Sequence, residues 1–141
     1  MKLKTYLILN GQAEDAANFY ADLLGGTIGS LFRYDSLPVQ PGMPKVQDDF
    51  KQKILHCDID FPGGTMSVAD SFPGDERNFG KGGHMLTLMC DSIAQTEEIY
   101  AKLCVDAQKI QCELSEAFFA KRYAEIFDRY GVLWALLYEE V

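Results

Sequence analysis

The sequence lacks the features by which several classes of protein are recognised. Its 13 Lys and Arg residues are outnumbered by 21 Asp and Glu, which gives a net charge of −8. No basic stripe is present to neutralise phosphates, and this excludes a nucleic-acid binder. No apolar run approaches the ~20 residues that a membrane-spanning helix needs, and residues 1–5 show no signal-peptide core. We therefore expect a cytoplasmic protein that contacts neither nucleic acid nor a membrane.

Residues that bind metals through sulfur or imidazole are also scarce. The chain has four cysteines and two histidines. The cysteines are Cys57, Cys90, Cys104 and Cys112. None belongs to a CxxC pair, and all four lie in apolar runs, where cysteine behaves as a small buried hydrophobe. We expect reduced thiols and no zinc site built from thiolates.

The 141 residues, of which 48% are hydrophobic, suit one domain with a real core. Helical periodicity predicts helices at 13–24 and 93–103. The predicted strands cover residues 3–9, 27–34, 53–61, 65–70, 84–90, 109–114, 118–127 and 132–138. The order strand, helix, three strands therefore occurs twice. This repeat predicts an α+β fold of two similar modules, at about 1–75 and 80–141, whose sheets cover each other's apolar faces.

The longest irregular stretch is residues 35–49, which contain Pro38, Pro41 and Pro44. Loops of this length in a compact domain are often lids or binding loops. We expect it to cover the mouth of a pocket.

Several segments, in order along nearly the whole chain, resemble one known family. They are Leu-Asn-Gly-Gln-Ala-Glu at 9–14, Asn-Phe-Tyr at 18–20, Leu-Gly-Gly at 24–26, Glu-Ala-Phe-Phe-Ala-Lys-Arg-Tyr at 116–123 and Asp-Arg-Tyr-Gly-Val-Leu-Trp at 128–134. The chain resembles the vicinal-oxygen-chelate superfamily, which includes glyoxalase I, bleomycin-resistance proteins and extradiol dioxygenases, and within it the PhnB-like branch. The resemblance implies two βαβββ modules that form a cupped mixed sheet around a central pocket, with helices on the outer face. It also implies a homodimer.

Metal-dependent members of this superfamily carry a ligand on the first and the last strand of each module. The resemblance puts these positions near Thr5, on the strand that ends at Asp70, at Met85 and near Ala135. His84 lies one residue before the third position, and a shift of one residue along a strand reverses the face. The usual set of His, Gln and Glu ligands is absent, so we expect no cofactor. A divalent metal held by His84 and Asp70 is the alternative.

The same register predicts a mostly apolar lining for the pocket. The ligand-binding candidates are Thr5, Leu7, Leu9, Met85, Thr87 and Ala135. Such a surface suits a small apolar or aromatic molecule. An equally good interpretation is that these side chains fill the cup as core.

Few polar residues are candidates for chemistry. His56 and Asp58 alternate with apolar neighbours and form a possible acid–base pair at i and i+2. The alternative is a solvated face, or a cross-strand contact of this pair with Arg33. The resemblance makes Glu116 and Arg122 candidates for the pocket, and a charge pair that orders their segment is the alternative.

We therefore interpret the chain as a PhnB-like, metal-independent protein that binds a small molecule. The alternatives are a lyase, isomerase or dioxygenase that uses a metal with atypical ligands or uses Glu116 or His56 without one, and a protein–protein module. Some relatives carry a methyltransferase label. The sequence has no dinucleotide-type glycine turn, so we give this label little weight.

Overall fold

A computed structural model of the protein describes residues 1–37, 41–42, 45–75 and 83–140. The chain forms two compact units, Met1–Arg77 and Asn78–Val141, each of which is described by itself. Each unit contains one helix and a mixed four-stranded sheet, in the order strand, helix, three strands. The predicted α+β fold with two βαβββ modules is confirmed. In the described ranges no helix is long and apolar enough to cross a membrane.

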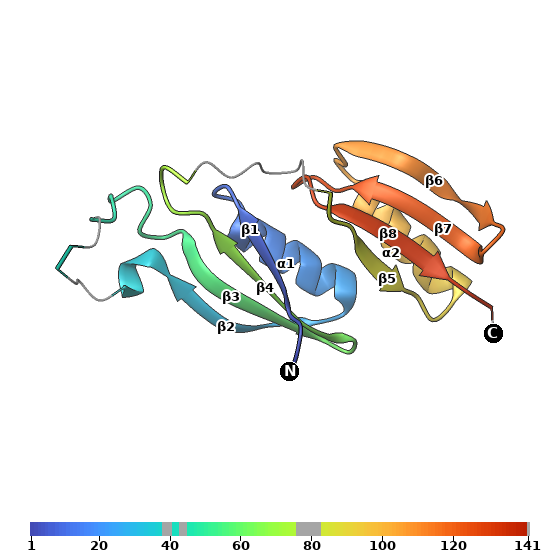
Figure 1. Ribbon diagram of the computed structural model, residues 1–141, viewed down its shortest axis with the longest axis horizontal. Coiled ribbons are helices and arrows are strands. Elements are labelled where there is room, and N and C mark those ends of the chain that lie inside the picture. The colour runs from blue at the N-terminus through green and yellow to red at the C-terminus, as the bar shows by residue number, and fades with distance from the viewer. Residues whose placement is uncertain (38–40, 43–44, 76–82, 141) are drawn as a thin grey trace. The chain divides into compact units, whose positions relative to one another are not determined.

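The first unit is a sheet with a helix on one face (Figure 1). Its elements are β1 (Thr5–Leu9), α1 (Ala13–Leu24), β2 (Thr27–Arg33), the short 3₁₀ helix η1 (Tyr34–Ser36), β3 (Ile54–Phe61) and β4 (Gly64–Asp70). The strand order is β1-β4-β3-β2; β1 runs parallel to β4, and the other pairs are antiparallel.

Helix α1 has the bounds that its apolar period predicts. Gly25 ends the helix in the left-handed conformation, with φ 63°, which glycine adopts without steric cost. The helix has no side-chain cap from Gln12. Instead, the buried carboxylate of Asp70 at the end of β4 accepts a hydrogen bond from the first helical amide, that of Ala13 (2.9 Å), and another from the amide of Ile54 (2.9 Å). Asp70 therefore joins the helix to two strands.

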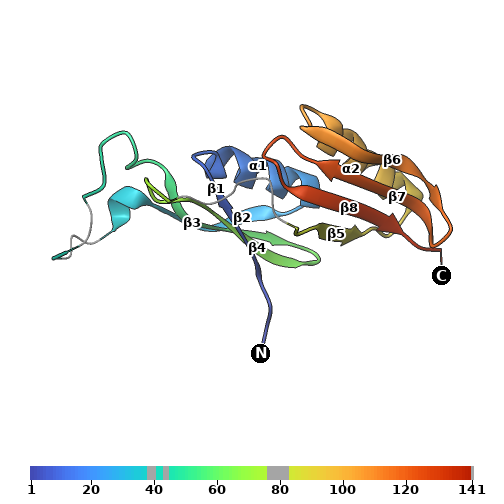
Figure 2. The same ribbon diagram turned by 45° about the horizontal axis from the view of Figure 1, so that its top comes forward.

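The second unit repeats this plan. Its elements are β5 (Leu86–Met89), α2 (Ile93–Cys104), β6 (Lys109–Ala117), β7 (Ala120–Phe127) and β8 (Leu133–Tyr138), with strand order β5-β8-β7-β6. Helix α2 lies against β7 and β8 on one face of this sheet (Figure 2). It begins after Ser92, whose hydroxyl accepts a hydrogen bond from the amide of Gln95, as expected of a good N-cap.

A buried aspartate organises the turn between β7 and β8. One carboxylate oxygen of Asp128 accepts hydrogen bonds from the amides of Tyr130 (2.9 Å) and Val132 (3.0 Å). The other oxygen accepts from Nε1 of Trp134 at 2.9 Å. Asp128 is fully buried and Trp134 nearly so. The predicted turn at residues 128–131 is confirmed, and Trp134 lies in the core on the side of α2.

One predicted strand begins in the wrong place. Strand β7 starts at Ala120, because Phe118 and Phe119 form a two-residue turn between the paired residues Ala117 and Ala120. The turn contains no glycine, asparagine or proline, so the usual signals were missing. Both phenylalanines are exposed, Phe118 completely.

The outer strands β2 and β6 are irregular. The register of β2 against β3 shifts between Ile28 and Leu31 and again after Phe32. The register of β6 against β7 shifts at three places. Such bulges bend a strand and interrupt its hydrogen-bond ladder.

The loop that we expected as a lid begins in an ordered way. Tyr34 is buried and its ring contacts Phe50 and Phe72, with centroids 4.8 and 5.5 Å apart. Its hydroxyl donates to the carbonyl of Asp70 at 2.7 Å. The part of the predicted lid at 38–40 and 43–44 lies outside the described residues.

Candidate functional site

Each sheet has one face covered by its helix and one open face. In the first unit Leu7 pairs with Val68, which pairs with Cys57 across β4 and β3. Val68 and Cys57 are both fully buried, and α1 contacts their strands. Leu7 therefore lies on the helix-covered face, as do Thr5 and Leu9, which alternate with it in phase.

Thr5, Leu7 and Leu9, predicted to line the pocket, therefore do not belong to the open face. Leu9 is only 5% exposed and belongs to the core under α1. The sequence of β1 is apolar on both sides, so its period does not reveal which side the helix covers. On the open face β1 presents Ile8 and Tyr6, of which Tyr6 is 45% exposed.

The open face of the first unit carries a hydrogen-bonded cluster, which we name the Tyr6 cluster. Its members are Lys4, Tyr6, His56, Asp58 and Ser67. The hydroxyl of Tyr6 lies 2.9 Å from Nδ1 of His56, and Nε2 of the same ring lies 3.1 Å from Oδ1 of Asp58. That oxygen also receives the ammonium of Lys4 at 2.5 Å and the hydroxyl of Ser67 at 2.6 Å. Three strand segments thus supply one connected network.

The network fixes the charge of Asp58. The bond from Lys4, helped by those from Ser67 and His56, lowers the pKa of Asp58 to about 2, so its carboxylate stays ionised. Burial, and then the negative charge of Asp58, raise the pKa of Tyr6, while Lys4 opposes this shift. The Tyr6 hydroxyl therefore keeps its proton.

The structure brings His56 and Asp58 together as an adjacent pair, which the alternation of β3 predicts. The alternative contact with Arg33 is not formed. Both outer nitrogens of Arg33 bind the carboxylate of Glu14 on α1, each at 2.8 Å. Phe32, which pairs with His56 across the strands and is 52% exposed, adds an aromatic ring to the open face.

The open face of the second unit is more apolar. Thr87 pairs with Ala135, and Met89 with Leu137. Met85 and Thr87 are exposed, as a lining would require, but Ala135 is fully buried. On the neighbouring strand the hydroxyl of Tyr123 donates to the carboxylate of Glu125 at 2.6 Å. This bond, together with burial, raises the pKa of Tyr123 to about 12.

Arg122 and Glu116 are not brought together. Arg122 alternates with Tyr123 and so lies on the side of α2, where its Nε approaches the carboxylate of Glu97 at 3.7 Å. Arg122, predicted to line the pocket, therefore lies on the face opposite to Tyr123 and Glu125. Its partner is the helix.

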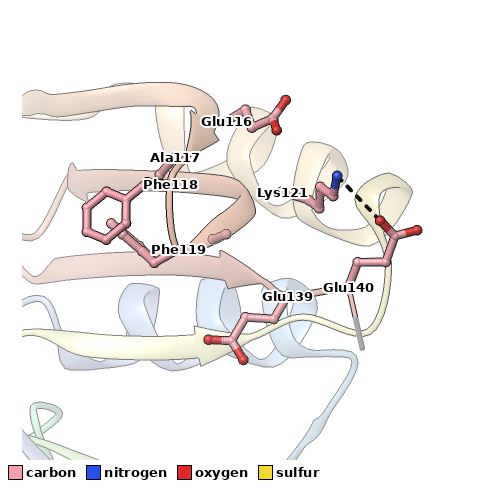
Figure 3. A pocket seen from close by; sticks show the side chains of 8 residues that line it. Glu116, Ala117, Phe118, Phe119, Lys121, Glu139 and Glu140 are labelled. Carbon is pink, nitrogen blue, oxygen red and sulfur yellow. Dashed lines mark ion pairs between the residues drawn. The ribbon is translucent and has the colours of Figure 1, made fainter.

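Glu116 borders a shallow hollow of about 360 Å³ at the Phe118–Phe119 turn (Figure 3). Lys121 and Glu140 also line it and form an ion pair of 3.5 Å. None of Met85, Thr87 and Ala135 lines this hollow. The other acids of the hollow, Glu139 and Glu140, are exposed. Among the described residues that line it, no chain of hydrogen bonds connects groups for proton transfer. The Tyr6 cluster is therefore the better candidate site.

The two metal candidates do not form a site in the described part of the chain. Both oxygens of Asp70 accept backbone amides, so a metal there would remove the bond that begins α1. His84 is exposed and precedes β5. Among the described residues no three His, Cys, Asp or Glu side chains are grouped closely enough to hold a metal ion.

Sequence reasoning missed three members of the Tyr6 cluster. Lys4 precedes β1, Tyr6 lies on the face of β1 opposite to the predicted lining, and Ser67 lies on β4, which meets β1 only in the fold. The one available signal was that Tyr6 carries a hydroxyl among the apolar residues Leu7, Ile8 and Leu9 of β1.

The comparisons with known proteins cover almost the whole chain, although no family model matches it. The crystal structure of protein PA1353 from Pseudomonas aeruginosa is 26% identical, with a TM-score of 0.86 and coverage of 100% of this chain and 99% of that one. A PhnB protein from Bacillus cereus, provisionally named a 3-demethylubiquinone-9 3-methyltransferase, is 27% identical, with a TM-score of 0.79 and coverage of 98% and 99%. Protein YjdN of Escherichia coli K12 is 21% identical over 96% of this chain and 94% of its own.

The chain is similar to PhnB-like proteins over almost its whole length, and its fold is that of the vicinal-oxygen-chelate superfamily. A glyoxylase/bleomycin resistance protein/dioxygenase domain from Frankia has the same fold, with 12% identity, a TM-score of 0.69 and coverage of 99% of this chain and 98% of that one. The resemblance read from the segments at 9–14, 116–123 and 128–134 is thereby confirmed. Since one fold supports many functions, the activity must be argued from the site.

Proposed function

We propose that this PhnB-like protein binds a small apolar or aromatic molecule on the open face of its first unit, without a resident metal. The observation that carries the proposal is the combination of Tyr6 and Phe32, both about half exposed, with the hydrogen-bonded groups of the Tyr6 cluster. Ligand sites in proteins commonly combine aromatic surface with a few convergent polar groups. The rings would stack on the ligand, and the cluster would recognise its polar atom.

The donor set supports the metal-free form of the proposal. A divalent ion at Asp58 would have to displace the ammonium of Lys4, and the same oxygen already accepts from Ser67 and lies beside His56. These residues do not fit a metal ion, because such a site needs several converging ligands with open coordination. Metal analysis of protein purified without chelator tests this point. Zinc, nickel, manganese or iron at one equivalent per chain would contradict it.

A thermal-shift screen with aromatic acids, phenols and heteroaromatic compounds tests ligand binding. A ligand present at 100 times its Kd stabilises the folded state by about 2.7 kcal/mol, so a rise in Tm is expected with at least one class. Phe32→Ala should abolish the shift, because it removes the stacking ring. Phe118→Ala is the matched control, an exposed phenylalanine of the other unit, and should keep the shift. No stabilisation by any class, or loss of the shift in both variants, would contradict the proposal.

We also propose that the protein is a cytoplasmic homodimer. Cys57, Cys90, Cys104 and Cys112 are all free, which suits a reducing compartment. The exposed methionines Met85 and Met89 on the open face of the second unit supply apolar surface for a second copy. Light scattering after size exclusion should give twice the chain mass of 15.8 kDa. A mass of one chain at micromolar concentration would refute the dimer.

A further inference from the structure

Tyr6, His56 and Asp58 form a continuous chain of contacts through the imidazole ring. The ring of Tyr6 lies close to that of His56, with centroids 5.5 Å apart, and the Tyr6 hydroxyl reaches Nδ1 at 2.9 Å. On the far side of the imidazole, Nε2 reaches Oδ1 of Asp58 at 3.1 Å. The imidazole therefore connects a half-exposed hydroxyl with an ionised carboxylate.

The carboxylate of Asp58 determines the direction of both hydrogen bonds of the His56 ring. Asp58 is a carboxylate and can only accept, so Nε2 of His56 must carry a hydrogen. In the neutral ring Nδ1 then has a lone pair and no hydrogen. It accepts the hydrogen of the Tyr6 hydroxyl, and this is the arrangement in which an imidazole acts as a base toward a hydroxyl group.

We propose that Tyr6, His56 and Asp58 are a proton relay that makes Tyr6 a catalytic acid–base residue toward the molecule bound on the open face. The proposal rests on the proposed function for the supply of that molecule. In the forward step Tyr6 Oη takes a proton from a hydroxyl or acidic C–H of the substrate, while its own proton passes to Nδ1 of His56. The electron pair stays on the substrate, and the carboxylate of Asp58 stabilises the imidazolium. The reverse transfer returns both protons, so no co-reactant is consumed.

The relay explains why Tyr6 needs a partner. Burial and the charge of Asp58 raise the pKa of Tyr6, so the free phenolate is disfavoured and the hydroxyl reacts only if a base receives its proton. The groups that face His56 are Tyr6 from β1, Lys4 before β1, Asp58 on its own strand and the uncharged Ser67 and Phe32. Lys4 offsets part of the charge of Asp58 without contacting the ring, so His56 remains the only base beside the hydroxyl among these groups.

The second unit provides an internal comparison. Tyr123 also donates to a neighbouring group on an open face, but that group is the carboxylate of Glu125 rather than an imidazole. Its pKa is raised to about 12, and a carboxylate is a much weaker base than imidazole. Tyr123 should therefore be unreactive under conditions in which Tyr6 reacts.

Phenylmethanesulfonyl fluoride tests the relay without knowledge of the natural substrate. Tyr6 Oη attacks sulfur, an O–S bond forms, the S–F bond breaks and fluoride leaves, while the phenolic proton passes to His56 and then to solvent. Peptide mass spectrometry should show Tyr6 labelled at least about tenfold faster than Tyr123, within the range that general-base assistance provides. Tyr6 should already be labelled at neutral pH, well below the range of about pH 10 in which an unassisted phenol ionises.

Variants separate the relay from a structural role. His56→Gln should reduce labelling of Tyr6 at neutral pH about tenfold or more. Glu125→Gln is the matched control and should leave Tyr6 labelling unchanged. If Tyr6 in the unmodified protein labels no faster than Tyr123, or only as pH approaches 10, the relay is refuted. Equal labelling of Tyr6 with and without His56 refutes it as well.

The ligand screen distinguishes the two proposals. Compounds that stabilise the protein while Tyr6 stays unreactive would leave the binding proposal standing and refute the relay. Reactive Tyr6 with no stabilising compound would refute the binding proposal and support the relay chemistry itself.

Discussion

The replacement Asp128→Asn tests the buried carboxylate that accepts hydrogen bonds from Tyr130, Val132 and Trp134 in the second unit. The amide has nearly the shape of the carboxylate but only one accepting oxygen. The native group accepts three hydrogen bonds, two on one oxygen from the amides of Tyr130 and Val132 and one on the other from Trp134. If the amide oxygen keeps the two backbone donors, its NH₂ group faces the indole N–H, and two donors meet in a fully buried place.

The expected loss follows from these contacts. A buried indole N–H without an acceptor costs about 1–3 kcal/mol, and the two remaining bonds become neutral and lose about half their strength. Together these effects predict that Asp128→Asn lowers the free energy of unfolding by about 3 kcal/mol. This is a large share of the 5–15 kcal/mol, approximately, that keeps a typical domain folded.

Urea unfolding, followed by far-ultraviolet circular dichroism, measures this change. Trp134 is the only tryptophan, so its fluorescence provides a second probe close to the altered contact. Asp106→Asn is the matched control, because Asp106 is exposed and has φ 56°, a conformation that asparagine tolerates. The control should change stability by less than about 0.5 kcal/mol.

A loss below about 1 kcal/mol for Asp128→Asn would refute the reasoning. A second comparison uses the Trp134→Phe background, in which the indole donor is already gone. There Asp128→Asn should cost clearly less than in the natural sequence, because the donor–donor conflict cannot arise. Equal costs in both backgrounds would show that the indole bond is not the source of the effect.

Two further predictions concern the first unit. The lowered pKa of Asp58 contributes stability that is present above its ordinary pKa of 3.8 and is lost as the pH falls toward about 2. The stability difference between the natural protein and Asp58→Asn, measured in urea, should therefore shrink by at most about 2 kcal/mol from pH 7 to pH 2; a constant difference would contradict this. A Cβ on Gly26 would lie 2.4 Å from the carbonyl oxygen of Asp60. Gly26→Ala should thus cost about 1–3 kcal/mol, whereas Gly83→Ala, with nothing within 4 Å, should be neutral in the same unfolding assay.

The sequence predicts where helices and strands lie better than it predicts which face of a sheet each side chain occupies. Helix α1 is marked by its apolar period and by Gly25, and α2 by Ser92, and these local signals do not depend on the rest of the fold. Strand β3 alternates clearly, so His56 and Asp58 were assigned to one face correctly. Strand β1 does not alternate, and its orientation is decided by pairing with β4, in which Thr5 pairs with Met66 and Leu9 with Asp70, far apart in the sequence.

The candidate site was predictable only in part, because pairing between strands far apart in the sequence decides which residues meet there. The pair at i and i+2 on β3 is visible within one strand, but its partners Lys4, Tyr6 and Ser67 come from other strands. No property of a single segment indicates that a tyrosine on the first strand will meet a histidine on the third. The face of Arg122 could not be predicted, because its alternation with Tyr123 can be assigned to a face only once the buried Ala124 and the contact of β7 with α2 are known.

The bulges of β2 and β6 have a consequence for growth of the sheets. Each of these strands forms one edge of its sheet. An edge strand offers unpaired backbone groups to any extended chain that approaches. An incoming strand needs an even row of donors and acceptors, and the repeated register shifts interrupt that row. Each sheet thus has one edge, β2 in the first unit and β6 in the second, that resists addition of a fifth strand.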